Sequence, residues 1–281
     1  MGTKSEYIRE ETEICLSVLL ELMTILGEYR DNIAIIGGWV PYFLMNHVRH
    51  EHIGSLDIDI ALNFEQVSEE HYRTILELLK KHDYVQKAEN IPYAFLKEVD
   101  TSIGGKFKVE VDILSGEYGG TERSHRHQRI QDIKARKARG TDLVFGHYES
   151  VKISGKMPDG SENEITVKVA GLIPFLVMKG MALWERKSEK DAYDIYFVIK
   201  NYPDGLGALV EEFRPHIDNK LIREGLGKIK AKFESLDMIG PKWIVNFEEM
   251  EDDEEKDMLQ RDSFERVNAF LDELNIQPYS E

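Results

Sequence analysis

Asp57 and Asp59, two aspartates spaced one residue apart, are the residues of this chain best suited to chemistry with a divalent cation. They lie in the apolar stretch Leu56–Leu62, which reads as a β-strand, and the alternation of a strand puts both carboxylates on one face. Gly54 and Ser55 come immediately before them and offer backbone amides and a hydroxyl group to phosphate oxygens. Because Mg²⁺ takes oxygen ligands, typically one or two carboxylates together with substrate phosphates, the pattern predicts a site for magnesium and a triphosphate.

A third carboxylate, Asp112, follows on a separate stretch of the chain. Residues 106–114 alternate strictly between apolar and charged side chains, so Lys108, Glu110 and Asp112 share one face of a second strand. An Asp-x-Asp pair alone is weak evidence for a site, because the solvent-exposed faces of strands often carry alternating acids. Three acids that converge from two strands repel one another unless cations lie between them, and the full set therefore favours a metal site.

The elements that must position these acids alternate between strands and helices. Ile33–Ile36 is predicted as a short buried strand that ends at Gly37 and Gly38, and Val40–His47 as a helix, because Pro41 is tolerated in a first helical turn. Further helices are predicted over residues 5–30 and 69–82. The remaining strands are predicted over residues 56–62, 84–87, 93–96, 106–114, 151–154 and 165–169.

From Leu172 onward the apolar periodicity is helical. The expected helices cover residues 172–186, 189–201, 205–214, 218–234 and 256–275. A mixed part followed by an all-helical part predicts an α+β fold. We expect a mixed sheet flanked by helices in a domain over residues 1–165, and a mainly helical domain over residues 166–281.

A Gly-Gly turn, a Gly-Ser pair, a strand carrying Asp-x-Asp and a third acid on a later strand together resemble the hallmark of the nucleotidyltransferase superfamily, whose fold is that of the polymerase-β palm. The resemblance spans residues 33–114. The positions that carry it are Gly37, Gly38, Gly54, Ser55, Asp57, Asp59 and Asp112. The simplest members place Gly-Ser at the start of a helix, whereas Ser55 directly precedes the acids here. This S-x-D-x-D arrangement is similar to the AbiEii and MenT type of bacterial toxin transferases.

A second block of residues resembles the same branch. Within residues 172–200 a helical lysine is followed by an Ala-Leu pair, an arginine, a charged turn and a KD-x-x-D helix. The matching positions are Lys179, Ala182, Leu183, Arg186, Asp191 and Asp194. Two matching blocks far apart in the chain are a stronger indication than either block alone.

Lys179 also stands out on its own helix, where Phe175 and Leu183 share its face at i, i+4 spacing. A lysine in such surroundings either snorkels at the helix edge or meets an anion, for which a nucleotide phosphate would serve. Asp191 and Asp194 lie at i, i+3 on the next helix, and Asp191 also suits a first turn, where the macrodipole favours acids. The resemblance implies that one of the two is a catalytic-site acid and leaves open which.

Residues 121–140 are strongly basic, with seven arginines and lysines against two acids, a local charge of +5. They form either a solvated helix face that pairs with acids elsewhere or a patch that contacts the phosphates of a triphosphate or an RNA. The candidate phosphate contacts are Arg123, Arg126, Arg129 and Arg136.

Composition narrows the function classes. The 281 residues suffice for one large core or two modest ones, and the formal charge of −16 repels nucleic acid and anionic membranes, so any RNA contact needs a local basic patch. Cys15 is the only cysteine, which excludes an intrachain disulfide and a multi-cysteine zinc site. His47, His50 and His52 have no further ligand that completes a tetrahedral set. A reducing, cytoplasmic compartment fits, and no apolar run approaches membrane-spanning length.

The resemblance implies an enzyme that moves a nucleoside monophosphate from an NTP to an acceptor hydroxyl, with Mg²⁺ as cofactor and pyrophosphate as leaving group. It assigns the metal to Asp57, Asp59 and Asp112, and the nucleotide to Gly37, Gly38, Ser55 and Lys179. The branch implies RNA, in particular the tRNA 3′ end, as acceptor and a cognate antitoxin protein as partner. Two alternatives stay open, namely transfer to a small molecule such as an antibiotic and a non-catalytic nucleotide- or RNA-binding module.

Overall fold

The computed structural model describes residues 3–7, 9–45, 52–63, 69–88, 91–102, 104–116 and 136–280, of which residues 69–72, 92, 136 and 137 are described by their backbone alone. The chain divides into two compact units. The sheet unit contains Ile8–Val40 and Gly54–Gly171, and the helical unit contains Met1–Tyr7, Pro41–Ile53 and Leu172–Glu281. The prediction of separate domains over 1–165 and 166–281 stays a prediction.

The sheet unit is built on a mixed sheet with eight strands in the described part of the chain. The strands are β1 (Ile33–Ile36), β2 (Asp57–Leu62), β3 (Val85–Ala88), β4 (Ile91–Asp100), β5 (Lys106–Ser115), β6 (Arg136–Lys137), β7 (Tyr148–Lys156) and β8 (Glu162–Ala170). Their order is β3-β4-β5-β2-β1-β8-β7, and β6 pairs with β5. The β1–β8, β2–β5 and β5–β6 pairs are parallel and the others antiparallel. The expected α+β class with a mixed sheet is confirmed.

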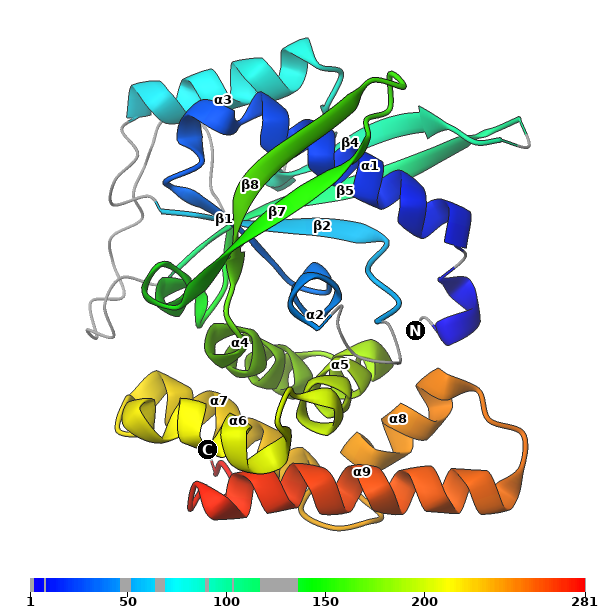
Figure 1. The fold of residues 1–281 in the computed structure, drawn as a ribbon, viewed down its shortest axis with the longest axis vertical. Coiled ribbons are helices and arrows are strands. Elements are labelled where there is room, and N and C mark those ends of the chain that lie inside the picture. The colour runs from blue at the N-terminus through cyan, green and yellow to red at the C-terminus, as the bar shows by residue number, and fades with distance from the viewer. Residues whose placement is uncertain are drawn as a thin grey trace. The chain divides into compact units, whose positions relative to one another are not determined.

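Alternation along the strands decides which side chains the sheet buries. In β2, Ile58 and Ile60 are buried, whereas Asp57 is exposed and Asp59 half-buried. Helix α1 (Arg9–Ile25) packs across β2, β5, β7 and β8 and beside α3 (Glu69–Lys81), as Figure 1 shows. One face of β2 therefore contributes to the core, and the opposite face carries its two aspartates.

The first helix is shorter than the expected span of residues 5–30. The α-helix ends at Ile25, and Gly27–Tyr29 forms a 3₁₀ turn. Glycine has a low helix propensity, so a helix readily ends near Gly27. After β1, helix α2 (Trp39–Leu44) begins in the sheet unit and ends in the helical unit.

The helical unit contains α4 (Leu172–Glu185), α5 (Glu189–Asn201), α6 (Gly205–Phe213), α7 (Lys220–Lys232), α8 (Ile239–Glu248) and α9 (Asp253–Glu273). Helix α4 packs on α7, and α8 packs on both α5 and α9. Gly180 and Gly225 lie at the α4–α7 contact, where a Cβ at Gly180 would overlap the carbonyl oxygen of Gly225. Among the described residues, no helix combines the length and the hydrophobicity that a membrane span requires.

Candidate active site

The parallel pairing of β2 with β5 brings the predicted acids together. Asp59 lies directly opposite Asp112, and Asp57 lies opposite Glu110. Residues paired across neighbouring strands project to the same side of a sheet, so the four carboxylates share one face, here called the acidic face. Asp57 is exposed and the other three are half-buried, so a ligand can reach the group from solvent.

The Gly37-Gly38 turn lies against the acidic face. Ile36, the last residue of β1, pairs with Asp59, and the chain then turns at Gly37 with a φ of 70°. A Cβ at Gly37 would overlap the carboxylate of Asp59. Glycine is therefore required here both for the left-handed backbone and for the space that the carboxylate occupies.

The Gly54-Ser55 pair supports Asp57. Gly54 has a φ of 78°, and a Cβ there would lie 2.8 Å from Thr12 Cγ2 and 3.2 Å from the Trp39 ring. Ser55 is buried, and its hydroxyl donates a hydrogen bond of 2.5 Å to Asp57 Oδ1. The Trp39 indole donates to the Asp57 carbonyl oxygen at 2.8 Å. Ser55 thus orients a carboxylate, and its predicted contact with phosphate stays a prediction.

Lys87 on β3 is a member of the acidic face that sequence reasoning missed. Its Nζ lies 2.6 Å from both carboxylate oxygens of Glu110 on β5. The hydrogen bond to Glu110 and the negative charges of Glu110 and Asp112 raise the pKa of Lys87. Lys87 lies near the end of the short strand β3, and no pattern in the sequence around it indicates a contact with Glu110.

The acidic face offers the type of ligand atom that magnesium prefers. All of its donors are carboxylate oxygens, the ligands that Mg²⁺ prefers, and the Gly37 turn accommodates the carboxylate of Asp59. Within the described ranges, no group of three or more histidine, cysteine, aspartate or glutamate side chains is arranged to hold a metal ion. Mg²⁺ commonly binds through one or two carboxylates together with substrate phosphates. The opposed carboxylates of Asp59 and Asp112 are therefore enough to supply its protein ligands.

The second predicted group lies in the helical unit, where the structure brings Lys179, Asp191 and Asp194 together. Lys179 Nζ lies 2.7 Å from Asp191 Oδ1 and 2.6 Å from Asp194 Oδ2, and all three residues are buried. Arg186 Nε binds Asp191 Oδ2 at 2.9 Å, and Lys190 Nζ binds Asp194 Oδ1 at 3.0 Å. Both aspartates therefore contact the lysine, and their catalytic role stays a prediction.

Electrostatics keep this cluster ionised. Burial opposes the charge on each group, but the opposite charges outweigh it. Asp191 and Asp194 hold the pKa of Lys179 above its ordinary value, Lys179 and Arg186 lower the pKa of Asp191, and Lys179 and Lys190 hold the pKa of Asp194 well below its usual range. Of the two alternatives that the sequence left open for Lys179, the lysine meets anions, and these anions are carboxylates of the chain itself.

His52 completes the cluster and was not predicted to be part of it. Its Nε2 lies 2.7 Å from Asp194 Oδ1, and its ring contacts those of Tyr193 and Phe197. Burial lowers the pKa of His52 to about 4, although the charge of Asp194 acts in the opposite direction. The imidazole is therefore neutral at pH 7 and donates Nε2–H to the carboxylate. His47 and His50 lie outside the described residues.

The basic segment falls largely outside the described residues. Arg123, Arg126 and Arg129 are not described, and Arg136 is described only by its backbone in β6. Their contacts with phosphate stay a prediction.

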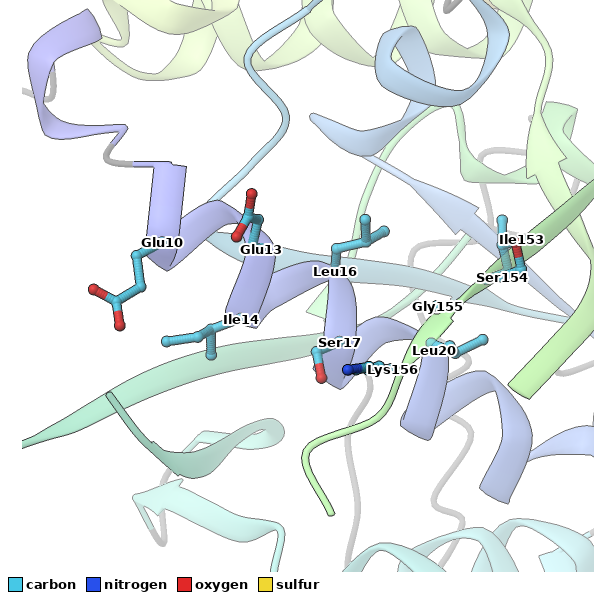
Figure 2. A pocket seen from close by; sticks show the side chains of 10 residues that line it. All are labelled: Glu10, Glu13, Ile14, Leu16, Ser17, Leu20, Ile153, Ser154, Gly155 and Lys156. Atoms are coloured by element: carbon cyan, nitrogen blue, oxygen red, sulfur yellow. The ribbon is translucent and has the colours of Figure 1, made fainter. Parts of the chain in front are cut away.

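A separate pocket of about 320 Å³ lies between α1 and β7 and is shown in Figure 2. Its lining includes Glu10, Glu13 and Lys156, and no residue predicted for the site lines it.

Comparisons with known proteins give little beyond this geometry. No protein-family model matches the chain, and no curated protein does. Among solved structures, the crystal structure of an antigenic nucleotidyltransferase-like protein from Paracoccidioides brasiliensis is 17% identical, with a TM-score of 0.38, over 78% of this chain and 94% of that chain. At this identity and TM-score the likeness supports no conclusion about activity, which has to be argued from the chain itself.

Proposed function

We propose that the protein is a Mg²⁺-dependent nucleotidyltransferase that transfers a nucleoside monophosphate from an NTP to an acceptor hydroxyl. The observation that carries the proposal is the pairing of Asp59 with Asp112 on adjacent parallel strands, with Asp57 on the same face. The glycine turn beside Asp59 leaves the space that the Asp59 carboxylate occupies. Carboxylates gathered in this way suit a reaction that needs mainly positioning and charge stabilisation.

Three aspartates of the acidic face, together with Ser55, have a role in this proposal. Asp57 and Asp59 would hold magnesium, which when bound offsets the charge of the triphosphate. Ser55 keeps the Asp57 carboxylate oriented through its hydrogen bond. Asp112 either serves as a further ligand or takes the proton of the acceptor hydroxyl. The acceptor oxygen bonds to the α-phosphorus as the bond to the β-phosphate bridging oxygen breaks, and pyrophosphate leaves.

Lys179, Asp191 and Asp194 enter the proposal through the second sequence block. Lys179 would offset charge on the triphosphate, and the resemblance gives one of the aspartates a catalytic role. Since Lys179 already contacts two buried carboxylates, a phosphate would share the lysine with them or displace one of them. This role depends on the sequence resemblance more than on the described contacts.

The proposed acceptor is RNA, in particular the 3′ end of tRNA, and the proposed setting is a toxin held in check by an antitoxin protein. The S-x-D-x-D arrangement and the block at residues 172–200 support this branch, as does the local charge of +5 over residues 121–140. Transfer to a small hydroxylated molecule and nucleotide binding without catalysis are the other outcomes that an assay separates.

The test is incubation of the protein with labelled NTPs, Mg²⁺ and total tRNA, with EDTA in a parallel reaction. We expect labelled RNA, and a fall of about 100-fold or more in Asp59→Asn and in Asp112→Asn, the scale on which loss of one transition-state charge contact lowers a rate. Glu98→Gln on β4 is the matched control, because this exposed carboxylate pairs with Lys106 and Lys108 instead.

The outcomes separate the alternatives. Label on a small molecule but not on RNA rejects the toxin branch, and neutralising Arg126 and Arg129 should then leave transfer unchanged. Triphosphate binding without turnover favours the binding module. Turnover that survives both Asp59→Asn and Asp112→Asn rejects the proposed active site.

A further inference from the structure

Lys87 reaches the acidic face from two strands away. It lies on β3, whereas Glu110 lies on β5, with β4 between them. In β4, Leu96 pairs with Glu110 and the small residue Ala94 pairs with Asp112. The lysine side chain extends over β4 and places its Nζ 2.6 Å from both oxygens of Glu110.

This ion pair lies among four carboxylates. Asp57, Asp59, Glu110 and Asp112 project from the same face, and the charge of Asp112 also acts on Lys87. The side chains of Lys87 and Glu110 are 41% and 35% exposed, so the pair is open to solvent and to ions. An ammonium group bound to one member of an acidic set repels any second cation that approaches the same set.

We propose that Lys87 is a built-in counter-cation of the acidic face, which competes with the divalent cation for its carboxylates and so sets the affinity of the face for metal. The inference rests on the proposed function, because the same carboxylates are taken to bind the metal. Without metal, Lys87 reduces the mutual repulsion of the acids. A bound metal would repel the lysine, and Glu110 would then be available as an additional oxygen donor.

The test measures binding of Mn²⁺ to the full-length protein by the loss of the free-ion electron paramagnetic resonance signal, so it does not depend on turnover. Lys87→Gln should bind Mn²⁺ about 5-fold more tightly than the wild type, the scale set by an exposed ion pair. Lys87→Arg keeps the charge and should stay near the wild-type affinity. Lys87 is partly exposed, and circular dichroism checks that both variants fold.

Lys108→Gln is the matched control. Lys108 lies on β5 on the same face, two residues from Glu110, but its Nζ contacts Glu98 at 3.2 Å. Its removal changes the net charge of the protein as much as Lys87→Gln does. We expect a change of less than about 2-fold, because Lys108 is exposed and pairs with Glu98 rather than with Glu110.

The outcomes distinguish this inference from the proposed function. If Asp59→Asn leaves Mn²⁺ binding unchanged, the acidic face is not the metal site and the proposed function fails. If Asp59→Asn abolishes binding but Lys87→Gln binds no more tightly than the wild type, only the role of Lys87 is rejected. Equal tightening in Lys87→Gln and Lys108→Gln also rejects it, since the effect would then be one of net charge.

Discussion

Asp194 lies in the buried ion-pair cluster of the helical unit, and its removal should destabilise that unit. Its carboxylate is fully buried and accepts from Lys179 at 2.6 Å, from His52 at 2.7 Å and from Lys190 at 3.0 Å. Asp194→Asn keeps the shape of the side chain but removes the negative charge that pairs with Lys179 and Lys190. Removing one partner of a buried ion pair costs about 3–5 kcal/mol of folding free energy.

We expect a loss near the lower limit, about 3 kcal/mol, because the amide oxygen of asparagine still accepts one hydrogen bond. This is roughly a 100-fold change in the unfolding equilibrium. Hydrogen-exchange mass spectrometry of peptides from α4 and α5, combined with urea denaturation, measures it for the helical unit directly. A local readout is needed because a chain of two units does not have to unfold in one step.

Glu211→Gln is the matched control within the same unit. Glu211 pairs with Arg214 at 3.0 Å, but both side chains are at least half exposed, so its loss should cost less than about 1 kcal/mol. If Asp194→Asn and Glu211→Gln are equally stable, the buried cluster does not stabilise the unit and the reasoning from its ion pairs is wrong.

Three further changes test other contacts. Because the pKa of His52 is about 4 in the folded protein against 6.5 for a free histidine, the unfolded chain binds the extra proton first, and stability falls by about 3 kcal/mol as pH falls from 6.5 to 4. Urea denaturation measures this effect. In His52→Gln, the loss of stability between pH 6.5 and pH 4 should be smaller than in the wild type by about 3 kcal/mol. Gly180→Ala should destabilise the protein by about 1–3 kcal/mol in thermal unfolding, since its Cβ would overlap the Gly225 carbonyl. Gly207→Ala, whose Cβ would meet nothing within 4 Å, should instead stabilise α6 by up to about 1 kcal/mol.

Strands and helices with a strong local pattern could be predicted from the sequence. The alternation of β5 fixes its inward side chains, and the strands expected over 151–154 and 165–169 lie within the longer antiparallel pair β7 and β8. Helix α8 was missed because Gly240 and Pro241 indicate a break in the chain. Both lie in its first turn, where the missing N–H of proline costs no intrahelical hydrogen bond.

The sequence predicts which aspartates form the acidic face, but not which residues they lie opposite or contact. The spacing of Asp57 and Asp59 shows that they share a face, whereas the register that sets Asp59 opposite Asp112 is decided by the packing of the whole sheet. Contacts such as His52 with Asp194, 142 residues apart, have no local pattern at all. The apolar helix around Lys179 predicted that the lysine either snorkels or meets an anion, and which of these occurs, and with which anion, depends on tertiary contacts.

The helical unit is discontinuous in sequence, and this affects how the protein can be divided for study. Residues 41–53 belong to it although they are encoded within the first third of the chain. A recombinant fragment that starts at Leu172 would retain Asp194 and lose His52, so a buried acceptor would be left without one of its donors. Truncation there would yield a weakened bundle rather than a free-standing half, and a fusion that joins residues 41–53 to the helices by a linker is the better expression strategy.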